Sequence, residues 1–530
     1  MTELLPLSAG FAESEPVTIE VRGDTAAGAV VVRYLGDVIA THDYDGSGVI
    51  DLGQLPVGGY GVQLGDARTA VEVRTDPASR LRYGFAVDYS PERDLAGISD
   101  TVRRLHLTGV QFYDWAYRHA DLHAGGEEYL DALQQPISLE SVRQLIRAVQ
   151  AAGARALGYA AVYAAGPDEW HQWKHAALLT ATGEPYGLGD FLFLLDPASP
   201  DWLSHFGGEL QTAVSSLGFD GFHLDQYGYP KRAVRPDGVI VDVADSFVTV
   251  IEAMRSALPD STLVFNNVND FPTWATASTS QDAVYIEVWP PHVTLDSLAR
   301  VVTRARSVAN GKPIVIAAYQ HVYDSAPAAA ADLATAFTMA ALFSHGATQL
   351  LAGEADRILV DPYYVRNHVV ESSTSELLKR WYDFLVEHDE LLLDPAVVDV
   401  TGSLAGEYNA DLDVSFANAS VAETAMPGTV WRRITESRGR SIVHLINLVG
   451  QSNAEWDAAR ATPGDPGDAT LRVRRIGQAV PRVQVADPDR EGFLIDVPVA
   501  VDGDYAVAQL PAFDVWQLVL VDPLIEEDAL

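Results

Sequence analysis

The chain has no cysteine, carries half as many basic as acidic residues, and contains no long apolar run. The missing cysteines exclude disulfides, thiolate metal sites and cysteine nucleophiles. With 36 Lys and Arg against 73 Asp and Glu, the formal net charge is −37, so nucleic acid and anionic membrane surfaces would repel the chain. We therefore expect no nucleic-acid or membrane partner and a surface adapted to solubility or salt. A neutral substrate would not be affected by this charge. The sequence leaves the oligomeric state open.

Targeting and metal-binding signals are also absent from the sequence. No segment approaches the roughly 18 to 20 apolar residues that span a bilayer, and the first twenty residues have neither a basic region nor a signal-peptide apolar run. We therefore expect a cytoplasmic protein, or a secreted one if a leader has been removed. Asp and His follow no metal-ligand spacing, so we predict no catalytic metal and no cofactor. A structural Ca²⁺ at the Asp-rich stretch 43–51 stays open.

What the chain does contain is 530 residues that are 48% hydrophobic and 9% aromatic, a composition typical of a folded protein of two to four domains. Residues 1–80 and 396–530 alternate apolar and polar positions in short runs separated by turn residues, which predicts a β-sandwich at each end. The N-terminal runs are 17–22, 29–35, 59–65 and 69–75, and the C-terminal runs are 441–449, 469–476, 482–488, 505–510 and 515–521.

Residues 81–395 have a different pattern, in which apolar strand-like runs alternate with amphipathic helical stretches such as 138–153 and 294–311. A further helix is expected at 375–388. The eight strand-like runs are 82–89, 109–115, 155–163, 218–226, 262–269, 283–289, 313–319 and 346–354. This pattern predicts the α/β class, as a (β/α)8 TIM barrel with loop insertions. A doubly wound sheet is the alternative, but no Gly-rich phosphate loop follows any run.

Catalytic residues of such barrels lie at the carboxyl ends of the strands, and that end is rich in acids and aromatic rings here. The polar residues that end predicted strands are Asp88, Asp114, Asp225, Asn267, Asn269, Glu287 and Glu354, and the aromatic residues beside them are Tyr113, Trp115, Tyr227, Trp289 and Tyr319. Carboxylates among aromatic rings favour a sugar site, because rings stack on the apolar face of a pyranose while carboxylates bind its hydroxyls.

Asp225 and Glu287 are the strongest catalytic candidates. They end the fourth and sixth strands, so their side chains are expected to converge across the mouth of the barrel. A retaining glycosidase needs two carboxyls about 5 to 5.5 Å apart, one ionised and one protonated. We expect an apolar wall such as Trp289 to raise the pKa of Glu287. The alternative is that each acid is an ion-pair partner at the barrel rim.

Three motifs resemble glycoside hydrolase family 66. They are QFYDWAYRH (111–119), GFDGFHLDQYG (218–228), which is similar to the family's nucleophile segment, and YIEVWP (285–290), which is similar to its acid/base segment. The resemblance implies an N-terminal immunoglobulin-like domain, a catalytic barrel and a C-terminal β-sandwich, with retaining action on α-1,6-linked glucan. It implies Asp225 as nucleophile and Glu287 as acid/base. The chain departs from the family near strand eight, where Gln349 stands in a segment that tends to hold a His.

A larger set of residues is predicted to bind substrate. His223 lies two residues before Asp225 and so faces the same side of the strand. The resemblance implies that Tyr113, Asp114 and His119 hold the sugar beside the scissile bond. The complete predicted substrate-binding set is Tyr113, Asp114, Trp115, His119, His223, Gln226, Tyr227, Asn267, Trp289, Tyr319 and Glu354.

The expected activity is that of a dextranase-like hydrolase of dextran or isomaltooligosaccharides. Within the resembling family, glucanotransferases usually carry a carbohydrate-binding module of roughly a hundred residues in the barrel region. No second sandwich-like segment is visible between 81 and 395, and the longest inter-strand stretch, 164–217, has the pattern of loop plus helix. This favours hydrolysis over cyclisation. Transglycosylation or processing of cyclic glucans at the same site is the second hypothesis, and a carbohydrate-binding protein on a degenerate barrel is the third.

Overall fold

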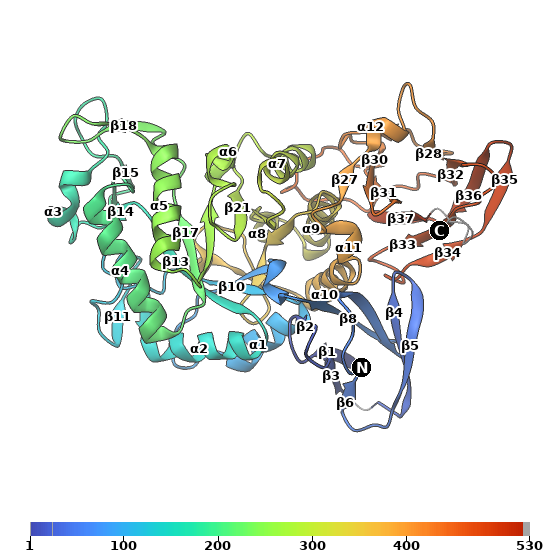
Figure 1. The fold of residues 1–530 in the computed structure, drawn as a ribbon, viewed down its shortest axis with the longest axis horizontal. Coiled ribbons are helices and arrows are strands. Elements are labelled where there is room, and N and C mark those ends of the chain that lie inside the picture. The colour runs from blue at the N-terminus through green and yellow to red at the C-terminus, as the bar shows by residue number, and fades with distance from the viewer. Residues whose placement is uncertain (1, 24, 523–530) are drawn as a thin grey trace.

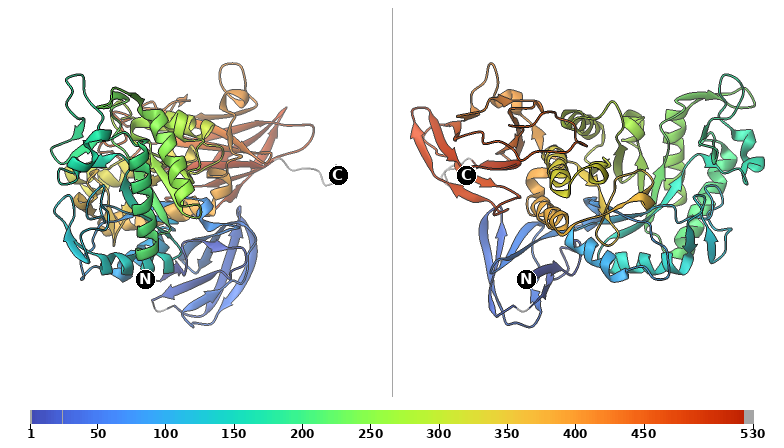
Figure 2. Two further views of the ribbon diagram at one scale, coloured as in Figure 1. Left: turned by 60° about the vertical axis from the view of Figure 1, so that its left-hand side comes forward. Right: turned by 180° about the vertical axis from the view of Figure 1, so that it is seen from behind.

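The computed structural model describes residues 2–23 and 25–522. The middle of the chain forms a barrel of strands and helices, on the left of Figure 1. The N-terminal strands lie at the lower right and the C-terminal strands at the upper right. Figure 2 shows the same three regions from two further directions. Within the described residues no helix is long and apolar enough to cross a membrane.

Eight parallel strands follow one another around the barrel in chain order, and each predicted run contains one of them. They are β9 (Tyr83–Ala86), β10 (Gly109–Phe112), β13 (Arg155–Ala161), β17 (Gly221–Asp225), β20 (Thr262–Asn266), β21 (Ala283–Glu287), β22 (Ile314–Ala317) and β23 (Thr348–Leu350) with its continuation β24 (Ala352–Gly353). β23 pairs with β22, and Gly353 of β24 pairs with Phe85 of β9, so the two edges of the sheet meet. The result is a closed, barrel-like α/β fold.

Helices cover the outside of the barrel, as the periodicity predicts. The longer ones are α1 (Leu95–Arg104), α2 (Leu139–Ala151), α4 (Pro200–Leu217), α5 (Val243–Ala257), α7 (Leu295–Val308), α9 (Ala328–Ser344) and α10 (Ser372–Glu387). The four-residue helices are α3 (Trp170–Trp173), α6 (Thr273–Thr276), α8 (Val322–Ser325), α11 (Asp389–Leu392) and α12 (Thr401–Leu404). Only α6 and a 3-10 turn lie between β20 and β21, so the fifth strand–helix unit lacks a long helix.

Local sequence explains several of these elements. The barrel strands are buried along all or nearly all of their length, as is typical of parallel strands covered by helices. Thr294 and Ser297 form a capping box that starts α7, and Gly218 ends α4 in the left-handed conformation with φ 91°. α9 is apolar on all sides because it packs against α7, α10 and a C-terminal strand.

Short antiparallel strands extend the loops at the carboxyl ends of the barrel strands. They pair as β11 (Glu128–Leu130) with β12 (Pro136–Ser138), as β14 (Ala164–Ala165) with β16 (Leu192–Leu194) and β15 (Gly187–Leu188), as β18 (Arg232–Val234) with β19 (Ile240–Asp242), and as β25 (Arg357–Ile358) with β26 (His368–Val369). The stretch 164–217 therefore holds a small three-stranded sheet as well as the predicted loop and helix.

The N-terminal region has two sheets. Strands β1 (Glu3–Pro6), β3 (Thr18–Arg22) and β6 (Val49–Asp51) form one, and β2 (Phe11–Ala12), β8 (Ala67–Arg74), β7 (Gly58–Leu64), β4 (Gly28–Tyr34) and β5 (Asp37–Tyr44) form the other. Both sheets contribute to one apolar core, which includes Leu4, Ile19, Val32 and Val62. β7 and β8 pack against α10, and buried ion pairs such as Arg80 with Asp389 at 3.0 Å join this region to the barrel.

The C-terminal region also has two sheets around one apolar core. The first contains β27 (Val398–Asp399), β29 (Val421–Ala422), β30 (Val430–Ser437), β31 (Arg440–Asn447), β37 (Trp516–Asp522), β33 (Arg482–Ala486) and β34 (Ile495–Val497). The second contains β28 (Leu412–Phe416), β32 (Ala469–Arg474), β36 (Tyr505–Leu510) and β35 (Val499–Asp502). The immunoglobulin-like and sandwich types, and the boundaries near 80 and 395, stay predictions.

Candidate active site

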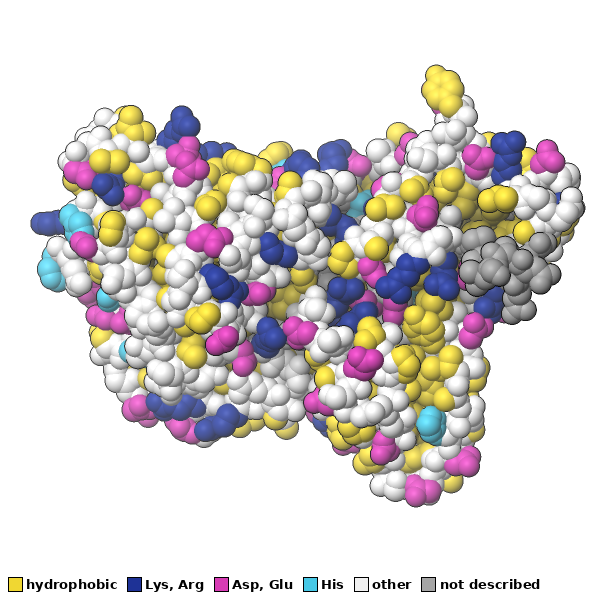
Figure 3. All heavy atoms as spheres, in the orientation of Figure 1, with side chains coloured by type: hydrophobic (Ala, Val, Ile, Leu, Met, Phe, Trp, Pro, Cys, Tyr) yellow, Lys and Arg dark blue, Asp and Glu magenta, His cyan; other side chains and the backbone are white. Residues whose placement is uncertain are grey.

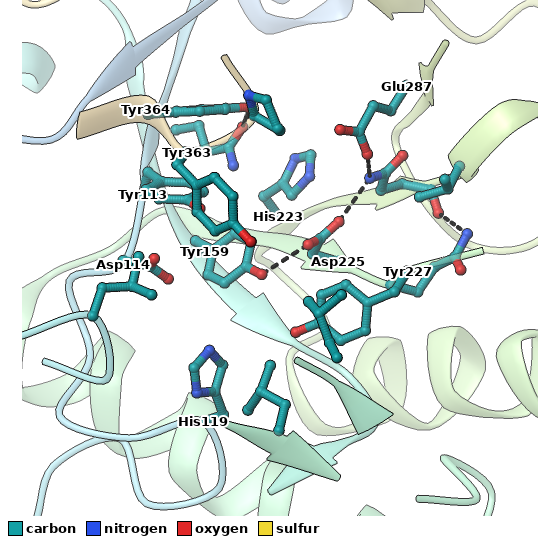
Figure 4. Close-up of a pocket in the computed structure, with 18 of the residues that line it drawn as sticks. Tyr113, Asp114, His119, Tyr159, His223, Asp225, Tyr227, Glu287, Tyr363 and Tyr364 are labelled. Atoms are coloured by element: carbon teal, nitrogen blue, oxygen red, sulfur yellow. Dashed lines mark hydrogen bonds between the residues drawn. The ribbon is translucent and has the colours of Figure 1, made fainter. Parts of the chain in front are cut away.

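A cavity of about 240 Å³ lies at the carboxyl ends of the barrel strands. Asp225 and Glu287 both line it, and each is the last residue of its strand, β17 or β21. Figure 4 shows the carboxyl groups of Asp225 and Glu287 near each other in the cavity, each at the end of a dashed hydrogen bond. Asn266 is the last residue of β20, the strand between β17 and β21. The order of strands in the barrel therefore places an amide donor between two acids.

Hydrogen bonds fix both carboxyl groups. Asn266 donates from Nδ2 to Asp225 Oδ1 at 2.7 Å and to Glu287 Oε2 at 3.0 Å. Tyr159 donates to the other oxygen of Asp225 at 2.7 Å, and Tyr319 donates to the other oxygen of Glu287 at 3.0 Å. All four carboxyl oxygens thus have a neutral donor, and no basic side chain is paired with either acid among the described residues.

The surroundings raise the pKa of both acids, and more for Glu287. Burial raises the pKa of Asp225 to about 6, against the hydrogen bonds from Asn266 and Tyr159, which lower it. Burial and then the charge of Asp225 raise the pKa of Glu287 to about 7. The direction of this shift is the one expected from a buried, apolar setting, and the polar group of Trp289 offsets only a small part of it. Near neutral pH the site therefore favours an ionised Asp225 and a protonated Glu287.

Tyrosine rings form much of the cavity wall. Tyr113 stacks on Tyr364 with ring centroids 4.2 Å apart and an interplanar angle of 20°. Tyr364 comes from a 3-10 turn (Tyr364–Arg366) in the chain after β25, and its hydroxyl donates to Gln111 at 3.3 Å. Tyr285 lies 3.4 Å from Tyr364, hydroxyl to hydroxyl. These rings offer flat apolar faces with hydroxyl groups at their edges, the surface that suits a pyranose.

Two histidines of the cavity are neutral. Burial lowers the pKa of His223 to about 3 and that of His119 to about 4. His223 Nδ1 lies 3.3 Å from the hydroxyl of Tyr83, and His119 Nδ1 is buried without a partner among the described residues. Each ring can therefore exchange hydrogen bonds with sugar hydroxyls without carrying a charge.

Asp114 lines the cavity from the loop after β10, with φ 45°, a left-handed conformation that Asp tolerates better than most residues. Burial and the charges of Asp131 and Asp225 raise its pKa well above the usual range. Tyr227 also lines the cavity, and its buried hydroxyl has no hydrogen-bond partner among the described residues. Gln226 lines it as well, but its Nε2 already donates to the backbone oxygens of Asn266 and Phe271.

Three residues of the predicted substrate-binding set do not line the cavity. Trp115 is fully buried and donates from Nε1 to the backbone of Tyr159 at 3.1 Å. Asn267 points away from the cavity, because its amide binds the backbone oxygens of Phe265 and Tyr285 at 3.3 and 3.0 Å. Glu354 accepts the backbone amide hydrogens of Val87 and Asp88, the latter at 2.8 Å. The structure thus gives these three side chains supporting positions.

The remaining predicted residues all line the cavity. They are Tyr113, Asp114, His119, His223, Asp225, Gln226, Tyr227, Glu287, Trp289 and Tyr319. The sequence-derived set omitted Gln111, Tyr159, Asn266, Tyr285, Tyr363 and Tyr364, which line it too. Gln349, where the chain departs from the family pattern, is buried in β23 and donates to the backbone of Ala318, outside the cavity lining. No group of three or more His, Cys, Asp or Glu that could hold a metal ion occurs among the described residues.

Known proteins of one glycoside hydrolase family are similar to this chain. The model of Glycosyl hydrolase family 66 matches residues 51–520. A cycloisomaltooligosaccharide glucanotransferase from Niallia circulans is 26% identical over 291 residues, 50% of this chain and 30% of that protein. A dextranase from Streptococcus salivarius is 25% identical over 502 residues, 80% of this chain and 60% of that protein. The chain therefore spans less than two thirds of the length of these relatives.

A solved structure shares the fold. It is a cycloisomaltooligosaccharide glucanotransferase from Paenibacillus sp. complexed with cycloisomaltoheptaose, with a TM-score of 0.86 and 19% sequence identity. The match covers 98% of this chain and 100% of that chain. Nearly all of the chain therefore follows one known architecture.

Proposed function

The chain belongs to glycoside hydrolase family 66, and we propose that it is a retaining enzyme that cleaves α-1,6-linked glucan, either dextran or isomaltooligosaccharides. The substrate class is suggested by relatives named as a dextranase and a cycloisomaltooligosaccharide glucanotransferase. A neutral glucan is compatible with the chain's large negative charge and with a cavity walled by tyrosine rings. We also propose that the flanking β regions are the immunoglobulin-like domain and the β-sandwich that the sequence predicts.

One observation carries the proposal of retention: a single amide nitrogen binds both acids. Asp225 Oδ1 and Glu287 Oε2 can be no further apart than the two hydrogen bonds to Asn266 Nδ2 placed end to end, about 5.7 Å. Retaining glycosidases hold their carboxyls about 5 to 5.5 Å apart, and inverting ones about 6.5 to 9.5 Å, to leave room for a water. The separation therefore supports double displacement.

The first step would form a glucosyl-enzyme. The ionised Asp225 attacks the anomeric carbon, the glycosidic C–O bond breaks, and Glu287 gives its proton to the leaving oxygen. In the second step Glu287, now ionised, takes a proton from water, whose oxygen attacks the anomeric carbon and releases Asp225. The higher pKa of Glu287 suits the proton donor.

The donors to the two acids would keep them in position through both steps. Tyr159 and Asn266 each hold one oxygen of Asp225, which leaves its remaining lone pairs for the anomeric carbon. Tyr319 and Asn266 hold Glu287 in the same way. Because every one of these donors is neutral, neither acid is stabilised as a full ion pair, and Glu287 can exchange its proton near neutral pH.

We propose hydrolysis as the main reaction. Between residues 81 and 395, all of which the structure describes, the strands outside the barrel form only small sheets of two or three strands and an antiparallel extension of the barrel edge. No inserted module of roughly a hundred residues stands there. Glucan transfer or cyclisation at the same site is the alternative, supported by the relatives that are glucanotransferases. A non-catalytic carbohydrate-binding protein is disfavoured by the presence of both acids in reacting geometry.

The test is product chromatography after incubation with dextran, linear isomaltooligosaccharides and cyclic isomaltooligosaccharides. Hydrolysis yields short linear products from the start of the reaction. Elongated or cyclic products from linear substrate would assign the chain to transfer. The Asp225→Asn and Glu287→Gln variants serve as controls for contaminating activity, and absence of any product with the parent protein would remove the enzymatic proposal.

A further inference from the structure

A second cavity, of about 320 Å³, lies at the opposite end of the barrel from the candidate active site. Leu81 just before β9, Ile314 at the start of β22 and Thr348 at the start of β23 line it. Its remaining wall comes from the end of α7, the chain after α11, and β27 with β30 of the C-terminal sheet. These elements meet near the centre of Figure 1, between the barrel and the C-terminal strands. The cavity is thus separated from the acids by the length of the barrel.

Most charged side chains in the lining of this cavity are basic. Arg80, Arg306, Lys312 and Arg433 line it, against one acid, Asp399. The whole chain has the reverse balance, with 73 acidic and 36 basic residues. Figure 3 shows Lys and Arg side chains on this face of the molecule where the barrel meets the C-terminal strands. A local excess of positive charge in so acidic a protein suggests that this cavity has a specific role.

Arg306 and Lys312 make no direct ion pair with a carboxylate among the described residues. The charge of Asp394 acts on Arg306, and those of Asp282 and Glu252 act on Lys312, from a greater distance. Arg306 donates to the backbone oxygens of Gly346, Asp394 and Val397 at 3.1 to 3.3 Å, using two of its three nitrogens. Lys312 donates two of its three hydrogens, to the backbone oxygens of Ala277 and Thr279 at 2.8 and 2.7 Å. Neither forms an ion pair among the described residues, so each cation keeps its charge and an unused donor.

The other two cations, Arg433 and Arg80, have carboxylate partners but still contribute positive charge to the cavity. Arg433 pairs with Asp399 at 2.9 Å, and Arg80 shares Asp389 with Arg74. Burial lowers the pKa of all four lining cations. After burial, the charge of Arg306 also lowers the pKa of Arg433, while Asp399 raises it. An anion between such groups would offset their positive charge and accept the unused donors.

We propose that this cavity binds a small oxyanion, such as phosphate, sulfate or the carboxylates of a small dicarboxylic acid. Guanidinium and ammonium groups around a partly buried space provide the charge-assisted hydrogen bonds that oxyanions accept. A neutral glucan offers no charge to such a site, and the chain's general negative charge would exclude large polyanions such as nucleic acid. The ligand is therefore a small ion, and the site is distinct from the one that contains Asp225 and Glu287.

The test is calorimetric titration of the full chain with sodium phosphate at constant ionic strength, with sulfate and succinate as further arms. We expect saturable binding of one ion per chain and a rise in Tm with ligand concentration. Arg306→Gln and Lys312→Gln should each weaken binding at least tenfold. Arg304→Gln is the matched control, because Arg304 lies on the same helix but outside the cavity, paired with Asp270.

Two further variants keep the result interpretable. Arg306→Lys retains the charge and should bind more tightly than Arg306→Gln even if loss of the guanidinium destabilises the fold. Asp225→Asn should bind phosphate as the parent does, because the active site is elsewhere. Absence of saturable binding at up to about 50 mM of each of the three ions, or binding unchanged in both Arg306→Gln and Lys312→Gln, would overturn the proposal. Neither result would bear on the glycosidase proposal.

Discussion

Asn266 donates a hydrogen bond to Asp225 at 2.7 Å, and through the same nitrogen it reaches Glu287 on the next strand of the barrel. This amide is the physical link between the two candidate catalytic groups. It donates to each acid and adds no charge of its own. The relative position of the two carboxyl groups therefore depends on Asn266.

Removal of the Asn266 amide, which links the two acids, should reduce catalysis with little change in substrate binding. In Asn266→Ala the carboxyl groups lose their shared donor and can rotate away from reacting geometry, so kcat should fall on the order of 10²-fold. KM should change much less, because the amide lies between the acids and not along the tyrosine wall. Steady-state kinetics on isomaltooligosaccharides measure both quantities. A kcat within threefold of the parent value would show that this amide has no positioning role.

Replacement of Glu287 should slow the reaction more when the leaving group is more basic, because a basic leaving group needs a proton to depart. Glu287→Gln cannot protonate the leaving oxygen, so hydrolysis of dextran should fall by about 10³-fold or more. An aryl α-glucoside whose phenolate leaves without protonation should lose much less in the bond-breaking step, seen as a burst of phenol. Equal losses on both substrates would contradict the role of Glu287, provided circular dichroism shows a native fold.

The pH dependence of kcat/KM should be bell-shaped. Activity needs Asp225 ionised, so it should rise as pH increases through about 6, and it needs Glu287 protonated, so it should fall as pH increases through about 7. The descending limb should disappear in Glu287→Gln when the activated substrate is used. A profile that rises steadily to pH 9 in the parent would conflict with a protonated Glu287.

The raised pKa of Glu287 also predicts a pH-dependent effect on the stability of the fold. Burial and Asp225 raise the folded-state pKa of Glu287 from 4.5 to about 7, so between these values the folded state binds a proton that the unfolded state has lost. Stability from this group is therefore full below about pH 4.5 and lost as pH rises to about 7. Glu287→Gln should have a higher Tm than the parent at pH 8, on the order of 2 °C, and the gain should vanish near pH 4.5.

The control for this measurement is Glu376→Gln, since Glu376 is exposed on α10 and does not line the cavity. Its Tm difference from the parent should stay constant over the same pH range. A Glu287→Gln gain that is independent of pH would mean that the buried carboxyl carries no ionisation penalty.

Glu354 should behave as a structural residue. Its side chain accepts the backbone amides of Val87 and Asp88 after β9, so Glu354→Ala leaves two donors without their acceptor and should cost about 1 to 3 kcal/mol of unfolding free energy. Thermal denaturation measures this loss, and kcat/KM of the folded protein should fall less than tenfold. Glu354→Gln keeps an acceptor oxygen and should restore part of the stability. A normal Tm with a large rise in KM would return Glu354 to the substrate-binding set.

Sequence periodicity was sufficient to locate all eight barrel strands, because each is a continuous apolar run bounded by polar or turn residues. It located the ends of the fourth and sixth strands at Asp225 and Glu287. The first and second strands end at Ala86 and Phe112, two residues before the predicted ends. The rule that residues two apart share a strand face correctly placed His223 beside Asp225. The same rule applied back from Glu287 would have found Tyr285, and from Tyr113 it would have found Gln111.

Other parts of the site had no local signal. Asn266 and Asn267 are adjacent and chemically identical, and only the twist and register of β20 decide which one faces the cavity. Tyr364 arrives from a turn beyond the eighth strand, and its stacking on Tyr113 joins positions 251 residues apart. Trp115 is part of a family-like motif, yet its indole supports β13 from within the core. Motif membership therefore predicted proximity to the site but not contact with the cavity.

The most direct test of the central claim is the identity of the residue that carries the glucosyl intermediate. The protein would be treated with a fluorinated α-glucosyl fluoride, which forms the covalent adduct but hydrolyses it slowly, and then digested and mapped by mass spectrometry. We expect one adduct per chain, on Asp225, and none in Asp225→Asn. An adduct on another carboxylate would contradict this assignment, as would an initial product of inverted anomeric configuration with no adduct formed.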